Sequence, residues 1–114
     1  MGLSRVWIRT LDGGLVRADH VVEVLAHQTA AFSGKPARWL LDVATAGSQG
    51  AGTTAQWNIG ASHRTLVQTA DEPRGAARRL AQLLWELDTR DAAGVVTVRR
   101  TPDTIDFDFE AFAT

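Results

Sequence analysis

The chain has 114 residues, the size of one domain, with 45% hydrophobic and 22% charged residues and a formal net charge of −1. This balance gives no electrostatic reason to expect a nucleic-acid partner or an anionic membrane surface. Cysteine is absent, which excludes disulfides, thiolate catalysis and Cys-ligated zinc. The N-terminal residues carry charge where a signal peptide needs an apolar core, so we expect a soluble, cytoplasmic protein.

Alternating apolar and polar residues predict a strand over residues 3–10. Val6 and Ile8 share one face of this strand, and Trp7 lies on the other. The Asp-Gly-Gly sequence at residues 12–14 is typical of a hairpin turn, which predicts that the chain reverses direction there.

The next segment, residues 15–26, allows two interpretations. Its second half is rich in β-branched residues, which favours a strand. A helix beginning at Asp19 is the alternative, because several apolar residues between 19 and 30 also fit helical spacing. We favour the strand.

Residues 37–44 form a nearly continuous apolar run, which predicts a central strand with Trp39 in the core. Asp42 interrupts the run, and we expect it on the polar face of that strand. The chain then becomes rich in glycine and small polar residues over about 45–56, which predicts a flexible loop. A further strand is expected at residues 63–69.

Residues 72–90 give the clearest helical pattern, with acidic residues at the start and Pro73 in the predicted first turn. An apolar stripe recurs at helical spacing and predicts the face that packs on the core. The stripe consists of Ala76, Leu80, Leu83, Leu84 and Leu87.

Two segments after the helix, residues 94–100 and 105–111, flank a Pro-Asp turn sequence and predict a β-hairpin. One register agrees with the pattern on both faces of this hairpin. It places Val98 opposite Phe107, Val96 opposite Phe109 and Arg99 opposite Asp106. Asp106, Asp108 and Glu110 then alternate along one face, which we interpret as the solvent side of the strand.

These elements predict an α+β fold in one domain over residues 1–114, in the order β-β-β-β-α-β-β. About six strands would form an antiparallel sheet, curved or partly closed, with one main helix at about 72–90 packed on one face.

Trp85 lies roughly opposite the apolar stripe of the predicted helix, between Arg74 and Arg78 on the helical surface. Ala77 and Ala81 form a row of small residues one and two turns before it. Either the helix is covered on a second side within the fold, or Trp85 contacts a partner. The combination of tryptophan and arginine is typical of interface hot spots.

No residue pattern in the chain indicates a catalytic or metal site. His20, Glu23 and His27 would share one face only in a helix, so the strand assignment separates them. Asp12 and Asp19 have simpler roles in a turn and beside Arg17. We therefore expect no metal and no cofactor, and we lean against an enzyme.

The leading hypothesis is a non-catalytic protein-interaction or assembly domain that forms a homo-oligomer or binds another protein. Its interface would consist of Trp85, Ala81, Ala77, Arg78 and Arg74. The alternative is a small-ligand-binding domain whose pocket lies near Trp7, Trp57 and His63, under the 45–56 loop. Neither hypothesis involves nucleic acid or a membrane.

Overall fold

Two β-sheets and one α-helix make up the part of the chain that this computed structural model describes, residues 2–31, 33–46 and 62–113. In chain order the elements are β1 (Val6–Arg9), β2 (Leu15–Arg17), the 3₁₀ turn η1 (Ala18–His20), β3 (Val21–Gln28), β4 (Trp39–Thr45), β5 (His63–Thr69), α1 (Ala76–Thr89), β6 (Gly94–Arg100) and β7 (Ile105–Ala111). Sheet A has the strand order β2-β1-β6-β7, and sheet B has the order β3-β4-β5. The α+β class is confirmed.

Sheet A is a mixed sheet whose two central strands come from opposite ends of the chain. β1 pairs parallel to β6, with Val6 beside Gly94 and Ile8 beside Val96. Val6 and Ile8 are buried and Trp7 is only partly buried, so the predicted alternation along the first strand is confirmed. The predicted hairpin turn is also confirmed, because β1 and β2 are antiparallel neighbours.

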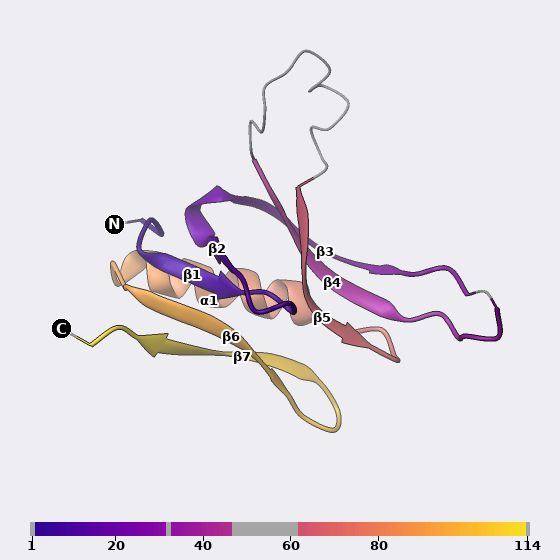
Figure 1. Ribbon diagram of the computed structural model, residues 1–114. Coiled ribbons are helices and arrows are strands. Elements are labelled where there is room, and N and C mark those ends of the chain that lie inside the picture. Colours follow the sequence, from indigo (N-terminus) through magenta and orange to yellow (C-terminus); the bar gives the residue numbers. More distant parts are fainter. Residues whose placement is uncertain (1, 32, 47–61, 114) are drawn as a thin grey trace, which may run out of the picture.

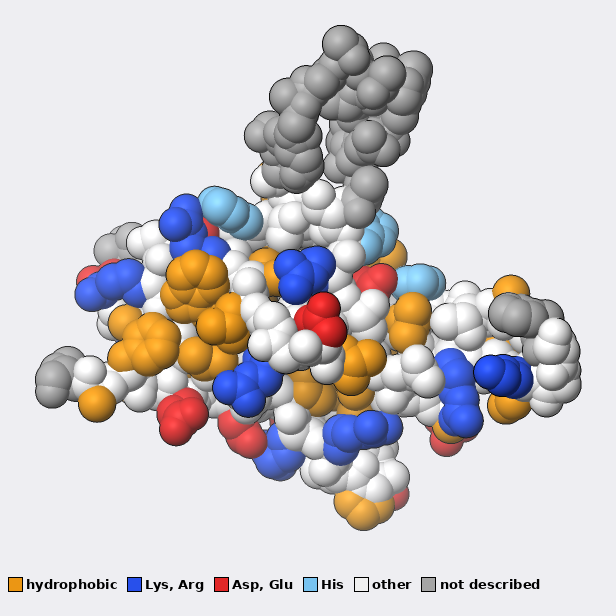
Figure 2. Space-filling model, in the orientation of Figure 1, with side chains coloured by type: hydrophobic (Ala, Val, Ile, Leu, Met, Phe, Trp, Pro, Cys, Tyr) orange, Lys and Arg blue, Asp and Glu red, His pale blue; other side chains and the backbone are white. Residues whose placement is uncertain are grey.

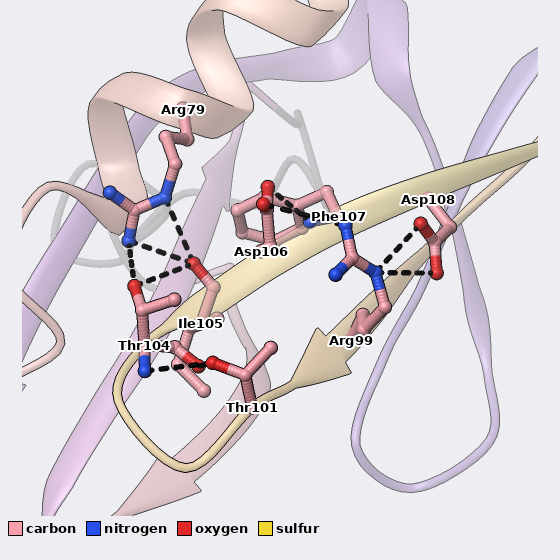
Figure 3. A network of polar contacts seen from close by, with 8 residues as sticks. All are labelled: Arg79, Arg99, Thr101, Thr104, Ile105, Asp106, Phe107 and Asp108. Carbon is pink, nitrogen blue, oxygen red and sulfur yellow. Dashed lines mark hydrogen bonds and ion pairs between the residues drawn. The ribbon is translucent and has the colours of Figure 1, made fainter.

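The β6–β7 hairpin has the predicted bounds and the predicted register. Val98 lies opposite Phe107, Val96 opposite Phe109 and Arg99 opposite Asp106. The Arg99 guanidinium lies closer to Asp108 than to Asp106, with N–O distances of 2.9 and 3.4 Å (Figure 3). Both carboxylates raise the pKa of Arg99, with the hydrogen bond to Asp108 as the largest cause.

The prediction of one antiparallel, curved or partly closed sheet is wrong. The strands divide between two sheets, neither of which closes or curls, and sheet A contains the parallel β1–β6 pair. The chain passes from sheet A to sheet B at η1, which follows the three-residue strand β2 and directly precedes β3 (Figure 1). A hydrogen bond from Leu11 N–H to the Thr65 carbonyl links the β1–β2 turn to sheet B.

Within the ambiguous segment at residues 19–30, the structure has a strand, as we favoured, and no α-helix. This strand, β3, spans Val21–Gln28 and pairs antiparallel with β4, with a register shift between Val21 and Glu23. Because η1 separates β3 from β2, the region predicted as one strand contributes two, and the described residues hold seven strands instead of about six.

The helix is shorter than predicted, because it begins at Ala76 and ends at Thr89. Gly75 takes a left-handed conformation, with φ of +74°, at the residue before the helix. Glu72 and Pro73 therefore belong to the preceding turn, and the first helical turn contains no acidic residue. The predicted core stripe is confirmed: Ala76, Leu80, Leu84 and Leu87 are buried and Leu83 packs against the core.

The helix α1 lies across one face of sheet A, behind β1 and β6 in Figure 1. Hydrogen bonds from Arg79 connect the helix to the β6–β7 turn (Figure 3). Its Nε and one terminal nitrogen donate hydrogen bonds to the Ile105 carbonyl at 3.0 and 2.8 Å, and the same terminal nitrogen donates to the Thr104 hydroxyl at 2.7 Å. With 14 residues, α1 is shorter than the roughly 20 that a bilayer crossing needs, and no helix in the described residues is suited to span a membrane.

Sheet B is built around β4, and the predicted strand at 63–69 is confirmed as β5. Leu41 and Val43 are buried in the main core. Trp39 is only half-buried, so its predicted place in the core is wrong. Trp39 is the first residue of β4, where it pairs with Gln28 and Thr69, the last residues of β3 and β5. Most of the predicted 45–56 loop lies outside the described residues.

Candidate functional site

An apolar groove of about 570 Å³ runs between α1 and the first half of β3. Two large apolar side chains at the groove are exposed: Trp85, which is 63% exposed, and Val22, which is 67% exposed. The groove is lined by Leu3, Val21, Val22, Glu23, Val24, Ala77, Arg78, Ala81, Leu84, Trp85 and Asp88.

Local structure explains why this groove stays open. The helix turns its apolar stripe toward the sheets, so Trp85 lies on the opposite side from the buried Leu80 and Leu87. Ala77 and Ala81 add little bulk beside it, which leaves space along the helix. On the other wall, the strand register shifts between Val21 and Glu23, and this bulge leaves Val22 exposed.

Charged residues of both signs lie along the groove. Arg78 and Glu23 are exposed, and Asp88 is partly exposed. Across residues 2–31, 33–46 and 62–113, no ion pair or side-chain hydrogen bond joins any of these three to another residue. The groove therefore combines apolar walls with charges that the monomer does not neutralise.

Four of the five residues predicted for the interface lie together in this groove: Trp85, Ala81, Ala77 and Arg78. Arg74 does not, because it precedes the helix and forms an ion pair with Glu72 at 3.4 Å. Sequence reasoning missed the β3 wall. Its run of valines was visible in the sequence, but nothing local indicated that it would face α1.

The ligand-binding alternative also has a counterpart in the structure. Trp7 and His63 line an open hollow of about 510 Å³, together with Arg17, His20 and Arg64 among others. Figure 2 shows this side of the molecule, where apolar side chains over β1 and β6 lie open among basic ones. Trp57 lies outside the described residues, so the predicted trio stays a prediction.

The cationic side chains in this hollow already have acidic partners. Arg17 pairs with Asp19 at 2.7 Å and Arg64 lies 3.8 Å from Asp12. A hydrogen bond from the Thr10 hydroxyl, followed by one from the Gly14 amide, lowers the pKa of Asp12 below its usual 3.8. Asp12 therefore serves the β1–β2 turn, as its sequence context indicated.

Asp42 is the acidic residue that the sequence analysis placed wrongly. It is 3% exposed instead of lying on an open polar face. Its carboxylate accepts a hydrogen bond from the Thr65 hydroxyl at 2.7 Å, and its other oxygen lies 2.8 Å from His27 Nε2. Sequence reasoning missed this cluster because its three members come from three different strands.

The geometry of the cluster indicates a structural role. Asp42 is 3% exposed, and its two carboxylate oxygens contact side chains from the strands on either side of β4. His20 and Glu23, which only a helix would group with His27, lie apart from this cluster: His20 contacts Arg17 at 2.9 Å and Glu23 lies at the groove. Within the described segments, no group of three or more histidine or acidic residues is arranged to hold a metal ion.

Comparison with known proteins identifies no relative of this chain. No family model matches the chain, and neither the curated proteins nor the solved structures gave a match. The geometry of the two sheets and the groove is therefore the basis for a functional proposal.

Proposed function

We propose that this chain is a non-catalytic protein-interaction domain that assembles with a second copy of itself through the groove between α1 and β3. The observation that carries the proposal is Trp85, the largest apolar side chain of the helix, which stands 63% exposed over an apolar groove. Covering a large apolar side chain of this kind stabilises a complex by about 1.5–3 kcal/mol. Tryptophan is also enriched among the residues that dominate binding energy.

A second copy suits the charges along the groove. The same short surface carries Arg78 together with the acidic Glu23 and Asp88, none of which has a partner in the described monomer. In a twofold arrangement each copy presents both signs to the other, so the surface is complementary to itself. A partner of uniform charge would leave one sign unpaired.

The groove is a better candidate than the hollow beside Trp7. In the hollow, Arg17 and Arg64 are already paired or close to acidic residues, which weakens their attraction for an anionic ligand. In the groove, Trp85 and Val22 are exposed, and the charges along it have no ion pair or side-chain hydrogen bond among the described residues.

Sedimentation velocity and native mass spectrometry of the wild-type chain test the proposal. We expect a dimer at concentrations up to about 100 μM, which corresponds to a binding free energy of about −5.5 kcal/mol or more favourable. Trp85→Arg should shift the protein to monomer, since it removes the anchor and adds a charge. Arg78→Glu should weaken association, because the surface becomes uniformly acidic.

Phe112→Ala is the matched control, because Phe112 is another exposed aromatic residue, 51% accessible, outside the groove. This variant should assemble like the wild type. Circular dichroism and urea unfolding of each variant at low concentration should match the wild type. A folded Trp85→Arg variant that still assembles, or a wild-type monomer throughout the concentration range, contradicts the proposal. A monomer with bound extra mass favours the ligand-binding alternative.

A further inference from the structure

The outer edge of β3 is an open strand edge. β3 is eight residues long and pairs with β4 alone, as the terminal strand of sheet B. Among the described residues, no backbone hydrogen bond reaches its other edge. No residue of β3 is fully buried, although five of its eight are apolar. Natural proteins usually protect a strand edge of this length with charge, bulges or a covering segment. In β3 the bulge between Val21 and Glu23 interrupts the start of the strand and leaves residues 23–28 as its regular edge.

The sequence of β3 is complementary to itself in one antiparallel register. Pairing two copies about Leu25 sets Glu23 opposite His27 of the second copy, and it does so twice. The same register sets Val24 opposite Ala26, and both of these pack against the core within their own chain. The two small apolar residues form a favourable cross-strand pair, and Glu23 faces a histidine whose Nε2 already contacts Asp42 of its own chain.

This register also leads into the groove. Beyond Glu23, the first copy continues backward through Val22 and Val21, which line the groove wall. In an antiparallel pair, the second copy's chain after His27 runs toward these two residues, where the bulge ends the regular pairing. The edge of β3 and the groove with Trp85 therefore form one continuous surface.

We propose that two copies join by antiparallel pairing of their β3 edges about Leu25. This pairing makes a six-stranded sheet from the two sheets B and brings each copy's residues after His27 beside the other's groove. The inference rests on the proposed self-association, for which it specifies the mode of contact.

Site-specific cross-linking tests the register. The chain has no cysteine, so Leu25→Cys introduces a single thiol at the proposed twofold axis. Directly opposite residues of an antiparallel pair have Cα atoms about 4.5–5.5 Å apart, within the range of about 4.4–6.8 Å for a disulfide. We expect mild oxidation to convert most of the protein to a covalent dimer, read on a non-reducing gel and by intact mass.

Gln28→Cys is the matched control, because Gln28 is exposed on the same strand but lies off the axis. In the proposed register its two copies are six residues apart along the strands, about 20 Å, which is too far for a disulfide. We expect at least about tenfold less covalent dimer from this variant under identical oxidation. Adding Trp85→Arg to Leu25→Cys should abolish the cross-link, because the same surface assembles the dimer.

Three results overturn the inference, and they separate it from the proposed function. Equal cross-linking of Leu25→Cys and Gln28→Cys shows random collision. A dimer that depends on Trp85 but gives no Leu25→Cys cross-link contradicts the strand pairing and is consistent with the groove interface. A wild-type chain that stays monomeric, with no cross-link from Leu25→Cys, contradicts both the proposed self-association and the strand pairing. Circular dichroism under reducing conditions confirms that each variant is folded.

Discussion

Asp42 joins the three strands of sheet B through side chains as well as through their backbone. Its carboxylate contacts His27 on β3 and Thr65 on β5, and the residue is 3% exposed. The alternation along β4 correctly separated Asp42 from the core residues Leu41 and Val43. It could not show that the face with Asp42 is covered, because the covering side chains come from strands 15 and 23 residues away in the chain.

Replacing Asp42 with alanine should destabilise the monomer by about 1–3 kcal/mol, because Thr65 and His27 lose a shared buried partner. Urea unfolding at low protein concentration measures this loss. Asp103→Ala is the control, since Asp103 is exposed in the β6–β7 turn and should change stability by less than about 0.5 kcal/mol. Equal effects from the two variants would mean that the cluster contributes nothing to stability.

At the scale of elements, Arg79 determines how the helix is held against the hairpin that follows it. Three of its hydrogen bonds reach Thr104 and Ile105, and a fourth reaches the Arg74 carbonyl at 3.1 Å. The planar guanidinium can serve these acceptors together, which an ammonium group cannot do. Arg79 therefore connects the turn before α1, the helix itself and the start of β7.

Arg79→Ala should cost about 1.5–3 kcal/mol of stability, the range for hydrogen bonds to a charged group, and Arg79→Lys should recover only part of it. Thermal and urea unfolding measure the difference. Arg90→Ala provides the comparison, because Arg90 is exposed and its side chain has no ion pair or hydrogen bond in the described segments. Full stability of Arg79→Lys would show that charge alone is sufficient at this position.

Elements whose pairing is local were predictable from the sequence, and those whose pairing is distant were not. The β6–β7 register follows from facing side chains on two strands joined by a short turn. The β1–β6 pair joins residues almost ninety positions apart, and neither strand's alternation identifies its neighbour. The helix start was misplaced for a local reason, because Gly75 adopts a left-handed conformation that interrupts the pattern.

At the scale of the whole molecule, only one part of the candidate site could be predicted from the sequence. Helical periodicity alone placed Trp85, Ala77 and Ala81 away from the core. The opposite wall of the groove comes from β3, more than fifty residues earlier in the chain, and its position depends on how sheet B packs beside α1. Periodicity could therefore identify one side of the groove but not the groove.

Self-association should make thermal stability depend on protein concentration, because only the folded chain can form the interface. At about one hundred times the dissociation constant, binding adds about 2.7 kcal/mol, which raises the Tm of a domain of this size by about 10 °C. Differential scanning fluorimetry over a wide concentration range measures this slope. The Trp85→Arg variant should show none. A concentration-independent Tm in the wild type would contradict assembly of the folded state.

The parallel pairing of β1 with β6 also has a consequence for the order of events during synthesis. A ribosome releases Val6–Arg9 long before it has made Gly94, Val95 and Val96, the residues beside which β1 lies. Until then, β1 has only the three-residue β2 as a partner in sheet A. Completion of sheet A is thus delayed until the last fifth of the polypeptide has been translated.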